Sequence, residues 1–137
     1  MEGFDRPAIT LAPGAVRPLR VLVVDDEALI RWSVSQTLAA AGMRVEQAGT
    51  GASALLALAG GPFDVVVLDL RLPDVDDLSL VAAVRRQSPE SSIVLMTAFG
   101  NAEVIIAARL LGVRAVLDKP FELDELTSVV HEVSAVA

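Results

Sequence analysis

The stretch "VVVLDLRLPD", residues 65–74, decides how this chain folds. Three valines and a leucine without polar alternation are typical of a strand covered on both faces, as in a parallel sheet. Asp69 ends this run, and Arg71, Pro73 and Asp74 follow it. Because a buried carboxylate without partners costs free energy, Asp69 is not explained by packing of the strand.

The rest of the chain repeats the same order, in which a short apolar strand precedes an Ala/Leu-rich helical segment. The expected strands are 19–26, 43–49, 63–70, 91–100 with its exit loop, and 113–120; the expected helices are 27–42, 51–61, 76–87, 101–112 and 122–136. Gly42 and Gly112 stand where a glycine commonly ends a helix. Such alternation predicts an α/β fold, a doubly wound, five-stranded parallel sheet with right-handed crossovers and helices on both faces.

The length and composition of the chain bound its class. Its 137 residues suit one domain, which we place at 19–136 after a flexible leader at 1–18 that contains three prolines and two glycines. The chain has no cysteine, so disulfides and thiolate metal sites are excluded. A net charge of −7 argues against direct binding of nucleic acid. There is no apolar run of membrane-spanning length and no signal-peptide pattern, so we expect a cytoplasmic protein without a membrane partner.

Polar residues stand at the ends of four expected strands. They are Asp25 and Asp26, Asp69, Thr97, and Lys119. Each residue alone is most simply a turn former, a helix cap or a solvated side chain. In an open parallel sheet, however, ligands bind beyond the carboxyl ends of the strands, so these residues should converge on one site.

The residue types at this edge favour phosphoryl chemistry. Three carboxylates against one ammonium leave excess negative charge, which a divalent cation would neutralise. Oxygen ligands without His or Cys favour Mg²⁺ or Mn²⁺. Asp69 is a competent nucleophile, Lys119 would neutralise phosphoryl oxygens, and Thr97 would donate a hydrogen bond to them.

Four separated motifs resemble the receiver domain of two-component response regulators. They are "VLVVDDE" (21–27), "VVVLDLRLPD" (65–74), "LMTAFG" (95–100) and "LDKPF" (117–121), and the resemblance covers about 19–135. It implies a flavodoxin-like sheet of strand order 2-1-3-4-5. It further implies that a sensor histidine kinase phosphorylates Asp69 in a Mg²⁺-dependent reaction.

The resemblance also implies a role for each site residue. Asp26 and Asp69 would bind Mg²⁺ directly, Asp25 would bind it through water, and Arg71 would bind it through its backbone carbonyl. Lys119 would contact the phosphoryl group. Thr97 would move toward that group and report phosphorylation, and the bond from Lys119 to Pro120 would be cis.

The stretches "LIRWSVSQTL" and "TAFGNAEV" resemble receivers of the nitrogen-regulator branch, which implies transcriptional control. Val116 stands where the family usually has Tyr or Phe, so the usual ring movement is not expected. Segment 101–112 is unusually apolar; together with 113–118 it is either a homodimer or output surface, or a tightly buried helix. Arg71 and Phe99 resemble lid positions and favour slow loss of the phosphoryl group.

Two alternatives to a signalling domain coupled to an output remain. A Mg²⁺-dependent aspartyl-phosphate phosphohydrolase would typically have an acid two residues after the nucleophile, where this chain has Arg71. A stand-alone receiver would act through protein–protein contacts alone. The motifs favour a phosphoacceptor that catalyses only its own phosphorylation and dephosphorylation, and is otherwise not an enzyme.

Overall fold

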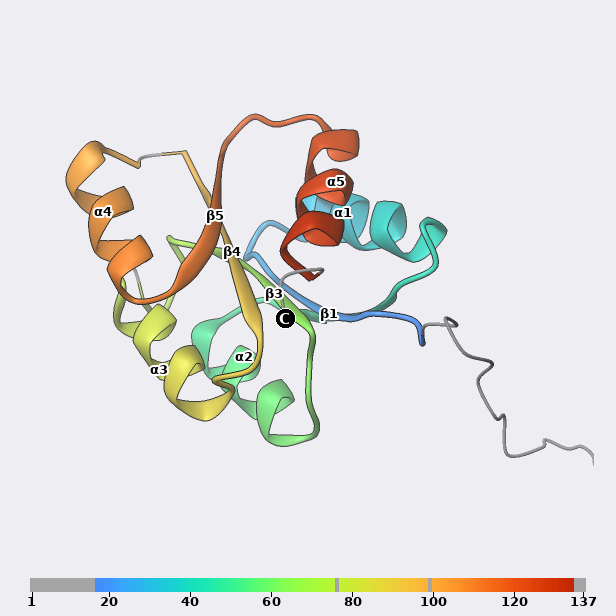
Figure 1. Cartoon of the computed structure of the whole chain (residues 1–137), viewed down its shortest axis with the longest axis horizontal. Coiled ribbons are helices and arrows are strands. Elements are labelled where there is room, and N and C mark those ends of the chain that lie inside the picture. The colour runs from blue at the N-terminus through green and yellow to red at the C-terminus, as the bar shows by residue number, and fades with distance from the viewer. Residues whose placement is uncertain (1–16, 76, 99, 135–137) are drawn as a thin grey trace, which may run out of the picture.

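The computed structural model describes residues 17–75, 77–98 and 100–134. It contains five parallel strands, as the alternation of strands and helices predicts, in the order β2-β1-β3-β4-β5 that the resemblance implies (Figure 1). The strands are β1 (Arg20–Val24), β2 (Arg44–Ala48), β3 (Val65–Asp69), β4 (Ser92–Thr97) and β5 (Val113–Asp118). The helices are α1 (Ala28–Ala40), α2 (Gly51–Ala59), α3 (Ser79–Gln87), α4 (Ala102–Leu110) and α5 (Leu123–Ser134).

Two hydrophobic cores lie on the two faces of the sheet. α2, α3 and α4 cover one face, and α1 and α5 cover the other (Figure 1). Successive residues of β1 alternate between these cores: Leu22 belongs to the first, and Val21 and Val23 belong to the second. The three inner strands are apolar at nearly every position because both of their faces are covered.

The register of the strands brings their carboxyl ends to one edge of the sheet. Val24 is opposite Leu68, Asp69 is opposite Met96, and Thr97 is opposite Asp118. Residues that follow β1, β3, β4 and β5 directly therefore meet at this edge.

The ends of the helices largely agree with the sequence. Gly42 and Gly112 have φ of 92° and 97°, the left-handed conformation expected of a helix-ending glycine. α3 begins at Ser79, later than the expected residue 76. The carboxylate of Asp77 accepts a hydrogen bond from the backbone N–H of Ser79 at 2.9 Å, which explains a start after this residue.

Only the last two residues of the expected leader, Arg17 and Pro18, belong to the described part of the chain. The Arg17 guanidinium binds both carboxylate oxygens of Asp64 at 2.7 and 2.8 Å. This pairing lowers the pKa of Asp64. None of the helices in the described ranges is long and apolar enough to cross a bilayer.

Candidate functional site

Three carboxylates meet where β1 and β3 end. Asp25 and Asp26 follow β1, and Asp69 is the last residue of β3. One oxygen from each of the three carboxylates lies within 4.8 Å of the others. Asp25 and Asp69 are buried, whereas Asp26 is exposed. The structure thus brings together the three acids that the sequence placed at separate strand ends.

Lys119 joins two of these carboxylates. Its Nζ lies 2.9 Å from Oδ2 of Asp25 and 3.0 Å from Oδ2 of Asp69. Glu27 Oε1 is more distant, at 3.9 Å. Burial opposes the charge on the ammonium, but the hydrogen bonds to Asp25 and Asp69 outweigh burial, so the pKa of Lys119 is raised. Lys119 is therefore a fixed positive charge at the centre of the acidic group.

Asp69 has a donor on each carboxylate oxygen. Oδ2 accepts from Lys119, and Oδ1 accepts from the backbone N–H of Arg71 at 3.1 Å. Burial nevertheless raises the pKa of Asp69, and the nearby charge of Asp25 acts in the same direction. The contacts from Arg71 and Lys119 oppose this rise only in part.

Asp25 is held by the protein on all sides. Its Oδ1 accepts from the backbone N–H of Glu27 at 2.9 Å, and its Oδ2 accepts from Lys119. Arg31 in α1 donates from Nη1 to the backbone carbonyl of Asp25 at 2.7 Å. The sequence did not single out Arg31, because nothing in its spacing reveals that it would reach back to the loop before its own helix.

The remaining predicted site residues lie around the same hollow. A cavity of about 240 Å³ is lined by Asp26, Glu27, Asp69, Arg71, Thr97, Ala98 and Lys119. Thr97 is buried at the end of β4, and the bond between Lys119 and Pro120 is cis, as expected. Phe99, which was expected to act as a lid, lies outside the described residues.

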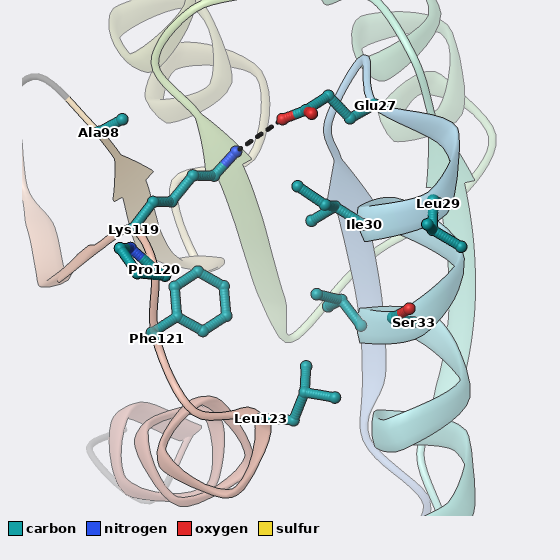
Figure 2. A pocket seen from close by; sticks show the side chains of 10 residues that line it. Glu27, Leu29, Ile30, Ser33, Ala98, Lys119, Pro120, Phe121 and Leu123 are labelled. Carbon is teal, nitrogen blue, oxygen red and sulfur yellow. Dashed lines mark ion pairs between the residues drawn. The ribbon is translucent and has the colours of Figure 1, made fainter.

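A second, mostly apolar cleft of about 560 Å³ adjoins this cavity and shares Glu27, Ala98 and Lys119 with it. Figure 2 shows that Leu29 and Ile30 of α1 lie on one side of the cleft and that Phe121 and Leu123 lie on the other. Leu29 is 75% exposed. The acidic site therefore opens beside an apolar surface.

The apolar helix α4 is only partly buried. Ala108 is its one buried residue, whereas Ile106 and Leu110 are 59% and 83% exposed. Val104 and Val116 are half-buried and pack against the core. The interpretation of segment 101–112 as a tightly enclosed helix is therefore wrong, and an apolar surface on α4 remains.

The donor set of the acidic site fits a divalent cation that prefers oxygen. It consists of carboxylates in an arrangement that leaves Asp26 exposed and Asp69 at the cavity wall. One ammonium offsets only part of the charge of three carboxylates. Oxygen ligands of this kind favour Mg²⁺ or Mn²⁺ over zinc.

Residues 21–131 match the family described as the response regulator receiver domain. The DNA-binding transcriptional regulator NtrC of Escherichia coli is 36% identical over 111 residues, which cover 81% of this chain and 24% of NtrC. The transcriptional regulatory protein TcrA of Mycobacterium tuberculosis is 37% identical over 115 residues, which cover 84% of this chain and 46% of TcrA. The chain thus spans about a quarter of the length of NtrC and less than half of the length of TcrA.

Solved structures show the same fold. A CheY-like receiver domain from Methanospirillum hungatei has a TM-score of 0.84 at 25% identity, over 88% of this chain and 96% of the other. The chemotaxis response regulator CheY4 of Vibrio cholerae has a TM-score of 0.79 at 33% identity, over 85% of this chain and 99% of the other. NtrX from Brucella abortus has a TM-score of 0.81 at 31% identity, over 88% of this chain and 27% of NtrX.

Proposed function

Because the chain belongs to the response regulator receiver family, we propose that it accepts a phosphoryl group on Asp69 from a sensor histidine kinase and thereby controls an output. The observation that carries this proposal is the position of Asp69. It ends a buried strand, lines a cavity, and has Lys119 and two further acids beside it. No packing role accounts for this arrangement.

Asp26 and Asp69 would bind Mg²⁺ directly, with the backbone carbonyl of Arg71 as a third ligand. Asp25 would bind through water, because it is fully buried, whereas Asp69 lines the cavity in which the cation would sit. When bound, the cation would neutralise phosphoryl oxygens during the transfer. The exposure of Asp26 and the opening of the cavity beside Asp69 support this assignment.

In the transfer, a carboxylate oxygen of Asp69 attacks the phosphorus of the phosphohistidine. The bond between phosphorus and the imidazole nitrogen breaks, and its electron pair returns to the ring. Lys119 loses its contact with Asp69 and follows the phosphoryl oxygens, since its ammonium already lies 3.0 Å from the nucleophile. Thr97, at the cavity wall, donates its hydroxyl hydrogen to the same group.

The kinase would cover the apolar cleft that adjoins the site. A donor histidine must come close to Asp69, so the surface around the cavity has to meet the donor protein. Leu29 and Leu123 are large, exposed apolar residues that line this cleft. Their burial would favour a protein donor over a small phosphodonor.

Ile106 and Leu110 on α4, with β5, would form the surface through which phosphorylated chains associate. Both side chains are large and exposed, and burial of such area is what stabilises association. The output would be transcription, in the cytoplasm, because NtrC and TcrA are transcriptional regulators. Within the chain, 1–18 would be a leader and 19–136 the receiver.

A phosphohydrolase is disfavoured because Arg71 stands where an acid–base carboxylate would be needed. The chain would therefore catalyse only its own phosphorylation and dephosphorylation. Incubation with Mg²⁺ and a small phosphodonor, followed by intact mass measurement, tests the proposal. We expect one added phosphoryl group in the wild type and none in Asp69→Asn; an equal addition to both would refute it.

A further inference from the structure

The loop that follows Asp69 is hydrogen-bonded to the first residues of α2. Asp74, five residues after Asp69, accepts hydrogen bonds from the backbone N–H groups of Gly51 at 2.8 Å and Ala52 at 3.0 Å. These are the first two residues of α2. Two carboxylate oxygens at the positive end of a helix make charge-assisted hydrogen bonds.

α2 does not need Asp74 to begin where it does. Thr50 already caps the helix: its Oγ1 accepts from the N–H of Ser53 at 3.0 Å, and the Ser53 hydroxyl accepts from the N–H of Thr50 at 3.1 Å. Asp74 accepts hydrogen bonds from the N–H groups of Gly51 and Ala52, which this capping box does not pair. Its contacts therefore serve the loop more than they serve the helix.

Residues 72–75 of this loop form a tight turn that two backbone hydrogen bonds close. The N–H of Leu72 donates to the carbonyl of Val75 at 2.9 Å, and the N–H of Val75 donates to the carbonyl of Leu72 at 3.3 Å. Leu72 is buried. Gly51 lies so close that a Cβ on it would meet Cγ1 of Val75 at 2.8 Å. The turn is thus pressed against the start of α2 and held there by Asp74.

The turn fixes the backbone that serves the phosphoacceptor. Arg71 directly precedes Leu72, and its N–H is the donor to Oδ1 of Asp69. Its carbonyl is the proposed backbone ligand of Mg²⁺. A shift of the turn would move both groups of this peptide segment together.

We propose that Asp74 is a positioning residue for the phosphoacceptor site: its carboxylate, bound to the start of α2, holds the 72–75 turn and through it sets the N–H and carbonyl of Arg71 beside Asp69. This role rests on the proposed function, since it concerns the same site. The lowered pKa of Asp74, caused by the N–H groups of Gly51 and Ala52, agrees with a carboxylate that stays charged at this contact.

The test compares Asp74→Ala, Asp74→Asn and the control Asp77→Ala. Asp77 also accepts a backbone hydrogen bond at a helix start, that of α3, and it is exposed like Asp74. Among the described residues, Asp77 makes no hydrogen bond to α2. Its replacement therefore removes a carboxylate at a helix start without releasing the turn. Asn at position 74 keeps one acceptor oxygen and should give an intermediate result.

Two readouts separate positioning from general loss of stability. Amide hydrogen exchange in metal-free protein should be faster at Arg71 in Asp74→Ala than in the wild type or in Asp77→Ala. Calorimetric titration should show Mg²⁺ affinity about tenfold weaker in Asp74→Ala, at the low end of the effect of outer-shell residues. In Asp77→Ala the Mg²⁺ affinity should stay within about twofold of the wild type.

Equal Arg71 exchange and equal Mg²⁺ affinity in Asp74→Ala and Asp77→Ala would overturn the positioning role. That failure is distinct from failure of the proposed function, in which the wild type itself takes no phosphoryl group from a small phosphodonor. The exchange measurement needs neither metal nor phosphodonor, so it tests the role of Asp74 in either case.

Discussion

Replacement of Asp69 by Asn should make the metal-free protein more stable, although it removes the phosphoacceptor. The oxygens of Asp25 and Asp26 lie within 4.8 Å of an Asp69 oxygen. Asp26 is exposed, so solvent screens most of its repulsion, and Lys119, 3.0 Å from Asp69, offsets the repulsion from Asp25. The main cost is burial of the charged carboxylate, which amounts to several kcal/mol before its hydrogen bonds are counted.

The raised pKa of Asp69 indicates that its hydrogen bonds to Lys119 and Arg71 offset this burial only in part. We therefore expect the free energy of unfolding to rise by about 1–2 kcal/mol in Asp69→Asn. Mg²⁺ should reverse the order: at a concentration 100 times the dissociation constant it stabilises the wild type by about 2.7 kcal/mol. The variant, which lacks a ligand oxygen with full charge, should gain far less.

The assay is urea unfolding followed by circular dichroism, in EDTA and in Mg²⁺. The exposed Asp118, in the same region of the sheet, provides the control Asp118→Asn, which should differ from the wild type by less than about 0.5 kcal/mol. An Asp69→Asn protein that is less stable than the wild type in EDTA would refute the reasoning that the site carries uncompensated negative charge.

The difference in stability between Asp69→Asn and the wild type should depend on pH. Because the folded-state pKa of Asp69 is raised, the folded protein binds this proton more tightly than the unfolded chain does. The cost of the charged carboxylate is present above the raised pKa and disappears as the pH falls through it. The advantage of Asp69→Asn in EDTA should therefore shrink on acidification.

Lys119→Ala should bind Mg²⁺ nearly as well as the wild type but take up the phosphoryl group about 100-fold more slowly, because its ammonium serves the transfer; loss of Mg²⁺ binding in calorimetry would contradict this role. Leu110→Glu should abolish phosphorylation-dependent association in light scattering, whereas Leu56→Glu, at an equally apolar and exposed site on α2, should not. Leu29→Glu should slow phosphorylation by a kinase about tenfold or more and leave small-phosphodonor phosphorylation unchanged; equal slowing of both reactions would exclude the cleft as the docking surface.

The sheet could be predicted from the sequence because its inner strands are covered on both faces. Uninterrupted apolar runs such as 65–68 and 93–96 carry that signal by themselves. The meeting of Asp25, Asp69 and Lys119 followed from the fold, since parallel strands end at the same edge. These patterns thus predicted the parallel sheet and the residues that gather beyond its strands, whereas the order of the strands came from the resemblance to receiver domains.

Other features depend on contacts between distant residues that have no local pattern. The bonds from Gly51 and Ala52 to Asp74 join positions 23 and 22 residues apart, respectively. In the sequence Asp74 looks like an ordinary turn residue after proline. The exposed face of α4 was also ambiguous, because an apolar helix pattern does not state which of its residues meet the sheet.

If Asp69 is the phosphoacceptor, its carboxylate must form an acyl phosphate. Borohydride reduces an aspartyl phosphate to homoserine, so treatment of the phosphorylated protein followed by peptide mass spectrometry identifies the residue directly. We expect homoserine at position 69, in a peptide that also contains unmodified Asp74, and only when Mg²⁺ and phosphodonor are both present. Homoserine at Asp25 or Asp26, or a phosphoryl group that leaves Asp69 unreduced, would contradict it.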